Sequence, residues 1–538
     1  MKIGDDELSK NVSIAESVAE NAVNQAGFGK FNYKIMAVCG LMYFNYGFGI
    51  SSLGIVMPSA ACDFEMTTVD KSRLSVSAAL GMLCGAYFWG CTADIKGRKF
   101  TLIAALMLHG GFDGMSAVVS NYWLFVATKF FSGLGMSGEL AVVFPYLGEF
   151  QPTHLRDRIL TWMELAWVFG FTVVPAIAWG IIPLNFGYHT TYFFFNSWNL
   201  FMLLCSIPSI LIAVQLYCLP ETPKYLAESG QYAELLNVLE RMFSDNTGAP
   251  VGEYAIKISK MGDSTLDELI SLARSTETKR KNRRTVADKI ASFRNQTVMM
   301  FRPPYLITTL IIGTVMMCLM SSYFTLVMWL PEVFNRFATF ESRYPGEVAN
   351  ICSITDRLRQ NTTNLLTSGL DSQNETMACE IGIQTDVYLH SIILGITSVP
   401  TAIWLPLFVE RLGYVFHLVL GSFICTAVIC GLFFVTTSVQ NLVLACVFEA
   451  IASICITAVL CMLVELYPTN LRVMAAAFAT FIGRVGCFAG SGLFGYLIDD
   501  YCIPLISIIA GQFFLSGVLC LFIPLKSKRQ NRSETSKP

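Results

Sequence analysis

The sequence predicts an all-α fold, a polytopic membrane protein whose twelve transmembrane helices form two pseudo-symmetric six-helix bundles. Composition is the first observation behind this prediction, because 54% of the 538 residues are hydrophobic and 14% are charged. Soluble globular chains carry about 25% charged residues, so this chain has too little charge to cover a soluble body of its length. The second observation is a series of long apolar runs, and the third is an internal repeat.

The apolar runs are long enough to cross a bilayer. A helix needs about 20 apolar residues to span the hydrocarbon, and each run must be helical because lipid offers no partner to backbone groups. Six runs precede a polar stretch and six follow it. The expected spans are Ile35–Cys62, Leu74–Ala93, Phe100–Ser120, Tyr122–Leu147, Leu160–Pro183, Phe194–Leu219, Tyr305–Leu330, Tyr388–Val409, Gly413–Val435, Asn441–Leu463, Met474–Ile498 and Cys502–Leu525.

Basic residues in the connecting segments predict the orientation of the chain. Lys and Arg gather in the loops on one side of the expected spans, whereas the opposite loops are acidic or nearly uncharged. Because short loops rich in Lys and Arg stay in the cytoplasm, both termini and the central loop are expected there. The expected parts are a cytoplasmic tail (1–30), a first bundle (31–220), a cytoplasmic linker (221–303), a second bundle (304–525) with an outer loop (331–387), and a cytoplasmic tail (526–538).

The expected outer loop carries two kinds of covalent modification signal. Asn361 and Asn374 each begin an N-glycosylation sequon, which requires a surface loop outside the cytoplasm. Cys352 and Cys379 lie in the same loop and are candidates for a disulfide in that oxidising compartment, although spacing alone does not establish their geometry.

Two motifs recur at a constant interval. The segment that begins at Asp94 has a counterpart at Glu410, and the segment that begins at Glu149 has a counterpart at Glu465. Both pairs are 316 residues apart, since 410 minus 94 and 465 minus 149 give the same value. An acid, a glycine, a proline and an arginine recur in the same register, which indicates two duplicated six-helix halves. Parallel halves of this kind are a transporter architecture.

Several of these segments resemble known transporter signatures. GCTADIKGRK (90–99) resembles the loop signature of the major facilitator superfamily, and GEFQPTHLR (148–156), PETPKYL (220–226) and ELYPTNLR (465–472) resemble sugar-porter signatures. GIVMPSAACDF (54–64) and AWGIIP (178–183) resemble the synaptic vesicle glycoprotein 2 family and related vesicle proteins. The resemblance covers residues from about 30 to 525. It implies a two-lobed helical transporter with a central cavity and rocker-switch alternating access.

The chain departs from that family at several positions. Its outer loop is shorter than in the long-loop members, so functions of their larger luminal domain are not expected. Tyr46 and Gly49 stand where family members have acids in span one, and Leu460 stands where an acid is expected in span ten. These replacements remove acids on which proton coupling would rest. Lys129 replaces a common arginine in span four, and Arg484 is an additional cation in span eleven.

The repeated loop motifs predict a cytoplasmic gate. Acids accompany the bases there, so ion pairs would form when the cytoplasmic side closes and break when it opens, which would latch the outward-facing state. The alternative is that the bases serve only to orient the chain. The expected gate residues are Asp94, Gly97, Arg98, Glu149, Arg156, Glu410, Arg411, Glu465 and Arg472.

Charged residues within the spans predict a central site. A charge near the bilayer centre is costly and usually functional. Such charges are Asp113, Lys129, Glu139, Glu164, Glu449 and Arg484. Glu139 and Glu449 lie near the middle of spans four and ten, which line the cavity in this superfamily. They suggest a cationic substrate or a protonation site, unless Lys129 and Arg484 pair with them as buried structural ion pairs.

Aromatic residues complete the predicted cavity. By resemblance, Trp167 and Trp329 match tryptophans that line the cavity of synaptic vesicle glycoprotein 2 relatives, and they would stack on a planar or cationic ligand. The alternative is an interfacial belt or ordinary packing. The full set of expected cavity residues is Tyr43, Tyr46, Lys129, Glu139, Trp167, Tyr323, Trp329, Glu449 and Arg484.

Taken together, these features predict a secondary active transporter of a small polar or organic-ion solute in the plasma membrane or a vesicle membrane. The alternative is a transporter-like glycoprotein that binds a ligand or partner without appreciable transport. The expected partners are the solute, the bilayer and a coupling proton or ion, and the protein is expected to act as a monomer. Balanced charge argues against a nucleic-acid partner. Neither a cofactor nor an enzymatic activity is expected, because the sequence carries no catalytic metal cluster, nucleotide loop or nucleophile signature.

Overall fold

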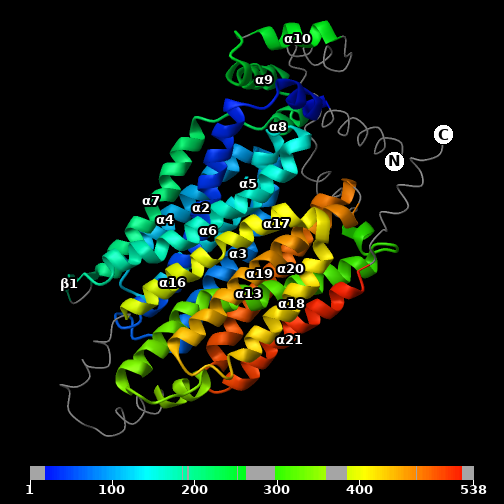
Figure 1. Cartoon of the computed structure of the whole chain (residues 1–538). Coiled ribbons are helices and arrows are strands. Elements are labelled where there is room, and N and C mark those ends of the chain that lie inside the picture. The colour runs from blue at the N-terminus through cyan, green and yellow to red at the C-terminus, as the bar shows by residue number, and fades with distance from the viewer. Residues whose placement is uncertain are drawn as a thin grey trace.

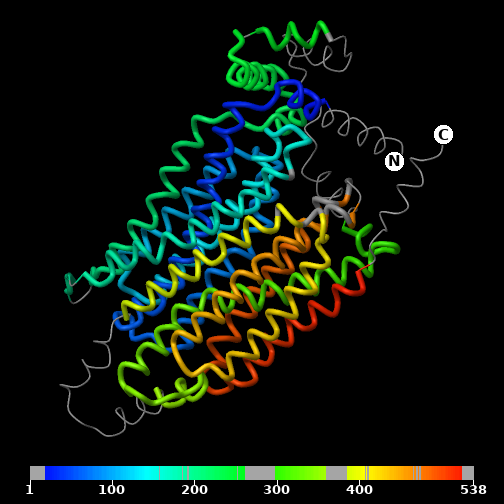
Figure 2. Tube along the Cα trace, viewed as in Figure 1, coloured from blue at the N-terminus to red at the C-terminus, as the bar shows by residue number. Residues whose placement is uncertain are grey.

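The computed structural model describes residues 18–184, 186–190, 193–250, 252–261, 297–358, 384–467 and 469–523. Helices dominate this part of the chain, and the first and second halves form two bundles that lie side by side (Figure 1). The Cα trace keeps the colours of the two halves largely on separate sides of the molecule (Figure 2). We call these bundles the first and second lobes.

The first lobe contains six long helices. They are α2 (Lys30–Ser59), α3 (Thr68–Lys96), α4 (Arg98–Ser116), α5 (Tyr122–Glu149), α6 (Thr153–Ile181) and α7 (Ser197–Tyr217). Side-chain caps help to begin two of them, because Thr67 accepts a hydrogen bond from the backbone of α3 and Asn121 does the same for α5. A hairpin of β1 (Gly187–His189) and β2 (Phe194–Asn196) joins α6 to α7.

The second lobe repeats this plan. Its helices are α13 (Leu306–Arg343), α16 (Thr385–Thr397), α17 (Val399–Leu412), α18 (Tyr414–Gly431), α19 (Ser438–Leu466), α20 (Thr469–Leu497) and α21 (Cys502–Leu521). Helices α16 and α17 follow one another within a single crossing, whose apolar stretch is Thr385–Leu405. Pro400 lies at the start of α17, where a missing backbone N–H breaks the continuous helix.

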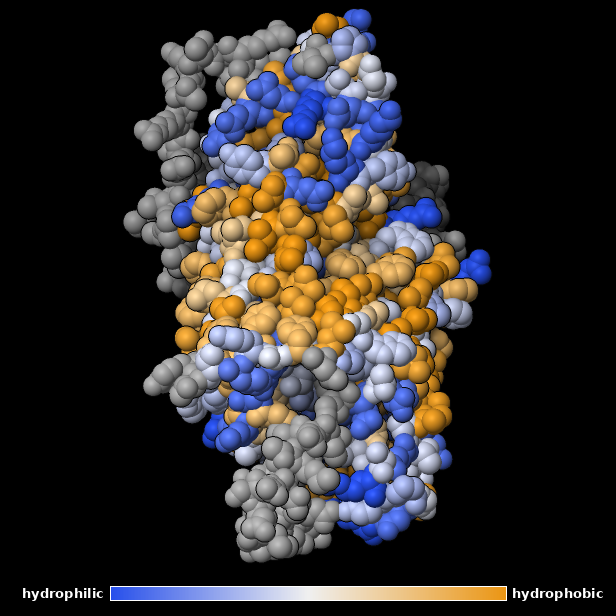
Figure 3. All heavy atoms as spheres, turned by 90° about the vertical axis from the view of Figure 1, so that its left-hand side faces the viewer, coloured by the Kyte–Doolittle hydropathy of each residue, from blue (hydrophilic) through white to orange (hydrophobic). Residues whose placement is uncertain are grey.

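The structure confirms the twelve-helix prediction. Within the described ranges, eleven crossings are long and apolar enough to span a bilayer by composition. The twelfth is α4, which is more polar because it begins with Arg98 and Lys99 and contains His109 and Asp113, yet it packs against α5 and α7 inside the first lobe. Apolar side chains form a band across the middle of one face, with hydrophilic residues towards both ends (Figure 3).

Two turns between helices are separated by the same interval as the sequence repeat. Gly97 joins α3 to α4 with φ of 101°, and Gly413 joins α17 to α18 with φ of 80°. Residues 97 and 413 are 316 positions apart. Both glycines adopt the left-handed region that other residues rarely enter, so one sharp turn between helices is repeated in the two halves.

The two lobes meet along three pairs of crossings. Helix α3 packs against α20, α6 packs against both α16 and α17, and α2 packs against α13. The polar segment after α7 folds as α8 (Pro223–Glu228), α9 (Tyr232–Thr247) and α10 (Glu253–Met261) beyond the first lobe (Figure 1). We call this end of the molecule the linker end.

The opposite end holds the longest departure from the expected boundaries. Helix α13 continues to Arg343, so the outer loop does not begin at residue 331 as expected. Glu332 and Arg336 lie on this extension and both form ion pairs there, with Glu332 buried and Arg336 partly exposed. Because the structure's disulfide also lies at this end, we call it the disulfide end.

Candidate functional site

A buried arginine marks the place where the two lobes meet. Arg484 of α20 donates a hydrogen bond of 2.7 Å to the hydroxyl of Tyr46 on α2. Its guanidinium also lies 5.8 Å from the Tyr46 ring and 5.7 Å from the Phe324 ring on α13. Arg484 is 4% exposed, so its charge is held between the lobes by a phenol and two aromatic faces.

Arg484 has no carboxylate partner among the residues that the structure describes. Its other hydrogen bond runs to the sulfur of Met82 on α3. Burying a charge without a counter-ion costs several kcal/mol, on the order of the penalty for any desolvated ion. A cation retained at such a cost inside a membrane protein indicates function.

Two carboxylates lie in the same region, each beside a tyrosine. Tyr323 of α13 donates to Oε1 of Glu449 on α19 over 2.7 Å, while the second oxygen of Glu449 is buried and has no hydrogen-bond partner among the described residues. The side chain of Tyr43 on α2 lies close to that of Glu164 on α6. Tyr43 stacks on Tyr46 at 6.0 Å between ring centres.

We call this set the lobe-interface cluster. Its members are Tyr43, Tyr46, Glu164, Tyr323, Glu449 and Arg484. A pocket opens beside it between α6, α17 and α19. Its polar lining comes from Thr161, Glu164, Thr401, Ser453 and Thr457. Carboxylates, hydroxyls and a guanidinium at a lobe interface suit a small polar solute.

A second group of buried charges lies wholly within the first lobe. Lys129 of α5 contacts Oδ1 of Asp113 on α4 at 2.9 Å. His109 of α4 contacts Oδ2 of Asp113 through Nε2 at 3.3 Å and Oε1 of Glu139 through Nδ1 at 2.7 Å. All four residues are at most 3% exposed. We call these four residues the His109 network.

Neutral polar groups surround the His109 network. Asn45 of α2 donates to Oε2 of Glu139 over 2.9 Å, and Ser132 of α5 donates to Asp113 over 2.8 Å. Ser209 of α7 donates to the Asn45 side-chain oxygen over 3.1 Å. Four helices therefore contribute to one connected set of buried hydrogen bonds, which makes each member dependent on the others.

At the linker end, Arg98 organises the predicted gate of the first lobe. Its guanidinium lies 3.3 Å from Glu149 and 3.7 Å from Asp94. The backbone N–H groups of Arg98 and Lys99 donate to the carboxylate of Glu221, so an anion sits at the N-terminus of α4. Burial raises the pKa of Glu221, although these donors and the Arg98 charge favour its ionised form.

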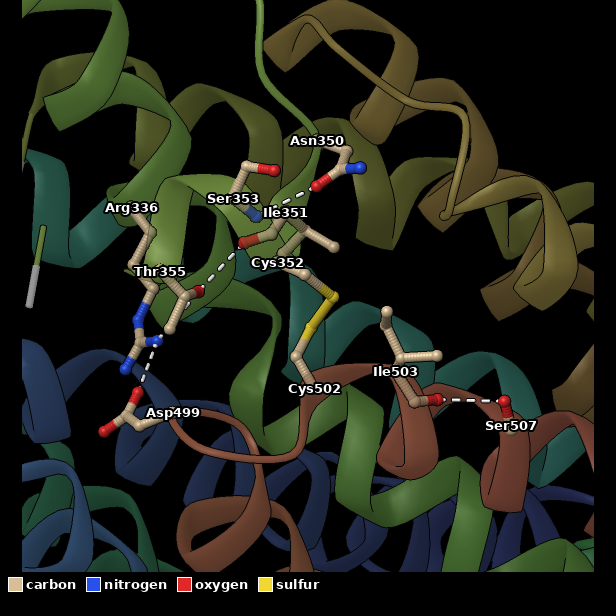
Figure 4. The surroundings of a disulfide bond; sticks show 10 residues. All are labelled: Arg336, Asn350, Ile351, Cys352, Ser353, Thr355, Asp499, Cys502, Ile503 and Ser507. Carbon is tan, nitrogen blue, oxygen red and sulfur yellow. Dashed lines mark hydrogen bonds and ion pairs between the residues drawn. A yellow bond between two sulfur atoms is a disulfide. The ribbon is translucent and has the colours of Figure 1, made fainter. Parts of the chain in front are cut away.

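At the disulfide end, an ion pair and a hydrogen bond connect the two lobes. Lys71 of α3 contacts both oxygens of Glu332 on α13 at 2.9 Å. Arg336 of α13 donates to Asp499 over 2.9 Å and to Thr68 of α3 over 3.1 Å. Figure 4 shows Arg336 directed at Asp499 beside the disulfide. We call these residues the disulfide-end latch.

The predicted disulfide partner was wrong. Cys352 pairs with Cys502, at the start of α21, with 5.6 Å between their Cα atoms (Figure 4). The bridge ties the segment after α13 to the last helix of the same lobe. The sequence placed Cys502 in an apolar run, where cysteine usually behaves as a small hydrophobe. Cys379, Asn361 and Asn374 lie outside the described residues.

Comparison with known proteins identifies the family. The family model described as "Sugar (and other) transporter" matches residues 33–330 and 374–535, which is well over half of the chain. The chain belongs to this transporter family.

The relatives of this transporter-family chain include vesicle proteins. Synaptic vesicle glycoprotein 2B of Mus musculus is 25% identical over 94% of this chain and 85% of its own length. Synaptic vesicle glycoprotein 2A of Homo sapiens is 29% identical over 61% of this chain and 46% of its own length. The resemblance stated from the sequence motifs is therefore confirmed.

Solved structures support the fold of this transporter-family member. The inward-open conformation of the xylose transporter XylE from E. coli has a TM-score of 0.61 at 15% identity, over 94% of this chain and 99% of that chain. The proton:xylose symporter XylE bound to 6-bromo-6-deoxy-D-glucose has a TM-score of 0.62 at 15% identity, over 92% and 96%. At 15% identity, this similarity is evidence for the fold alone.

The structure separates the predicted cavity residues into two groups. Tyr43, Tyr46, Tyr323, Glu449 and Arg484 come together at the lobe interface. Lys129 and Glu139 belong instead to the His109 network, so they do not pair with Arg484 and Glu449.

The two tryptophans lie in packed surroundings. Trp167 stacks on Phe171 of its own helix, at 5.5 Å between ring centres, and its backbone touches Gly47 of α2. Trp329 is fully buried and stacks on Phe494 of α20 at 4.8 Å. Their contribution to a ligand site remains a prediction.

The predicted gate residues differ between the two halves. In the first lobe Arg156 pairs with Glu20 at 2.8 Å rather than with a gate acid. In the second lobe Arg411 is exposed, and the side chains of Glu410, Glu465 and Arg472 lie outside the described set.

Sequence reasoning missed His109 and Asn45. His109 is one polar residue in an apolar run, which usually indicates a satisfied core histidine. A signal was present nonetheless, because residues four apart share a helix face, and His109 precedes Asp113 by four.

Proposed function

We propose that this protein is a secondary transporter that moves a small polar or organic-ion solute by alternating access. The observation that carries the proposal is the lobe-interface cluster, in which Arg484 is buried between the lobes without a carboxylate partner among the described residues. A solute with an acceptor group would satisfy this guanidinium, and its passage would require the lobes to separate around it.

Solute recognition would use groups from both lobes. Arg484 presents a planar set of donors that suits carboxylate-like or hydroxyl oxygens. The free oxygen of Glu449 would accept a hydrogen bond from the solute. The hydroxyl-lined pocket beside Glu164 adds neutral donors and acceptors. These groups favour a hydrogen-bonding solute over an apolar one.

Alternating access would use the contacts at the two ends. Opening at the disulfide end requires the Lys71–Glu332 pair and the Arg336–Thr68 hydrogen bond to break, because both connect the lobes. Arg98 with Asp94 and Glu149, and the corresponding residues of the second half, would act at the linker end. Discrete contacts of this kind give a two-state element rather than a continuous deformation.

The proposed orientation places the linker end in the cytoplasm. Basic loops gather at that end, whereas the Cys352–Cys502 bridge requires an oxidising compartment at the other. The sequons at Asn361 and Asn374 are expected on the same side as the disulfide. The protein would act as a monomer in the plasma membrane or a vesicle membrane, with a proton as the coupling ion.

The test is net flux in proteoliposomes that contain the purified full-length chain. A panel of radiolabelled sugars, carboxylates and organic amines would be offered with and without a pH gradient. We expect accumulation of at least one solute class, reduced at least tenfold in Arg484→Ala. Saturable binding without net flux of that solute would instead support a transporter-like binding protein.

A further inference from the structure

His109 lies between two carboxylates in the middle of the first lobe. Its Nδ1 atom is 2.7 Å from Oε1 of Glu139, and its Nε2 atom is 3.3 Å from Oδ2 of Asp113. The ring is 2% exposed. Both nitrogens therefore face carboxylate oxygens, and the 2.7 Å contact at Nδ1 is short enough to require a hydrogen between the two atoms.

The hydrogen bonds around His109 require one proton more than a neutral imidazole and two ionised carboxylates provide. A neutral imidazole has one N–H and one lone pair, whereas an ionised carboxylate only accepts hydrogen bonds. With His109 neutral and both acids ionised, a nitrogen lone pair would face an oxygen lone pair. The geometry is satisfied when the imidazole carries a second proton or when one facing carboxyl is protonated.

Charge accounting leads to the same result. Lys129 offsets one of the two acids through its 2.9 Å contact with Asp113. With the extra proton the His109 network is neutral overall, and without it the network carries one negative charge away from water. Uncompensated charge at this depth is unfavourable, so one proton has a defined place here.

We propose that His109 and Glu139 together bind the coupling proton of this transporter, while the Asp113–Lys129 pair positions the imidazole. This inference rests on the proposed transport function. The proton would enter from water on one side, protonate the His109–Glu139 pair, and leave to water on the other side after the lobes reorient. No covalent bond between heavy atoms forms or breaks.

Two further titratable groups and the backbone of α2 lie close to the His109 network. Other titratable groups near the pair are Cys205 of α7, close to Asp113, and Tyr46 of α2, close to Glu139. On α2, a Cβ at Gly49 would lie 3.0 Å from the imidazole ring. The ring therefore packs directly on the α2 backbone.

Helix α2 connects the proton site to the lobe interface. Asn45 donates to Glu139 over 2.9 Å, and the next residue, Tyr46, accepts the hydrogen bond from Arg484 of the other lobe. A change in protonation at Glu139 alters the acceptor of Asn45. Tyr46, which makes the inter-lobe contact, is the next residue in the chain after Asn45. Protonation of Glu139 is therefore coupled through α2 to the contact between the lobes.

The test uses proteoliposomes with the membrane potential clamped. For one proton per solute, a gradient of one pH unit supports about tenfold solute accumulation, since one pH unit is 1.36 kcal/mol. We expect this accumulation in the native protein and its loss in His109→Gln and Glu139→Gln, while solute exchange at equal pH persists. His417→Gln is the matched control, because His417 is a buried histidine of the second lobe that contacts a backbone carbonyl.

The outcomes separate this inference from the proposed function. Absence of any flux in the native protein overturns the proposed function. The proton site alone is overturned if flux in the native protein does not depend on the pH gradient. It is also overturned if the variants retain gradient-driven accumulation. If both variants fail to fold, Ser209→Ala removes a neutral partner of Asn45 and His109. It should then shift the pH of half-maximal uptake, and an unchanged pH profile would overturn the proton site.

Discussion

The guanidinium of Arg484 and the hydroxyl of Tyr46 form a 2.7 Å hydrogen bond between helices of opposite lobes. Removing the hydroxyl in Tyr46→Phe leaves a buried charged donor without this partner, a loss of about 1–3 kcal/mol. We expect Tyr46→Phe to lower the thermal stability of the purified protein and to change solute affinity. Tyr33→Phe is the control, because Tyr33 is 60% exposed. Equal stabilities for the two variants would contradict the assigned contact.

The disulfide-end latch predicts a charge-dependent equilibrium between conformations. Glu332→Gln leaves Lys71 and Arg336 without their shared acid, at a cost on the order of 3 kcal/mol because both are mostly buried. We expect the disulfide end to open, measured as faster labelling of a cysteine introduced at Ser72, which is buried against α20. The exchanged pair Lys71→Glu with Glu332→Lys should restore part of the protection. Slow labelling in the single variant would argue that this latch does not hold the lobes.

The Cys352–Cys502 bridge predicts different effects for two cysteines that the sequence does not distinguish. The bridge closes a segment of 150 residues, so Cys502→Ser should lower the free energy of unfolding by about 2–5 kcal/mol. Cys379→Ser should leave the bridge intact. Mass spectrometry of non-reduced peptides checks the pairing directly, and a Cys352–Cys379 peptide would refute it.

We predict that replacing Arg98 lowers the stability of the linker end. Arg98 is 7% exposed and its guanidinium lies 3.3 Å from the mostly buried Glu149, so Arg98→Ala leaves that acid uncompensated at a cost of about 3 kcal/mol. We expect a lower melting temperature and a shift towards the inward-facing state, read from cysteine accessibility at the linker end. Arg158→Ala is the control, because Arg158 is exposed. Matching melting temperatures and accessibility would leave Arg98 as an orientation signal alone.

The fold was predictable because it depends on local and repeated features. Long apolar runs specify helices in lipid whatever their partners are, and the constant interval that relates Gly97 to Gly413 specifies two similar halves. Family signatures such as the segment that begins at Asp94 pointed to the same architecture. Helix ends were less predictable, since α13 continues for a further 13 residues beyond Leu330 where ion pairs replace lipid contacts.

The partners of buried charges could not be predicted, because they depend on how helices face one another. Lys129 pairs with Asp113 across two adjacent helices, whereas Arg484 binds a tyrosine of the other lobe. His109 was overlooked because a lone polar residue in an apolar run carries little information until its neighbours are placed. Cys502 pairs across 150 residues, and chain spacing does not encode such tertiary contacts.

The most direct test of alternating access is a pair of distances between spin labels, measured by pulsed electron paramagnetic resonance in nanodiscs. Spin labels at Trp123 and Ile503 would report the disulfide end, and labels at Phe100 and Ile307 would report the linker end, because all four positions are exposed. We predict that addition of solute at a lowered pH changes the two distances in opposite directions. Distances that stay fixed at both ends under every condition would contradict a transporter whose lobes move around Arg484.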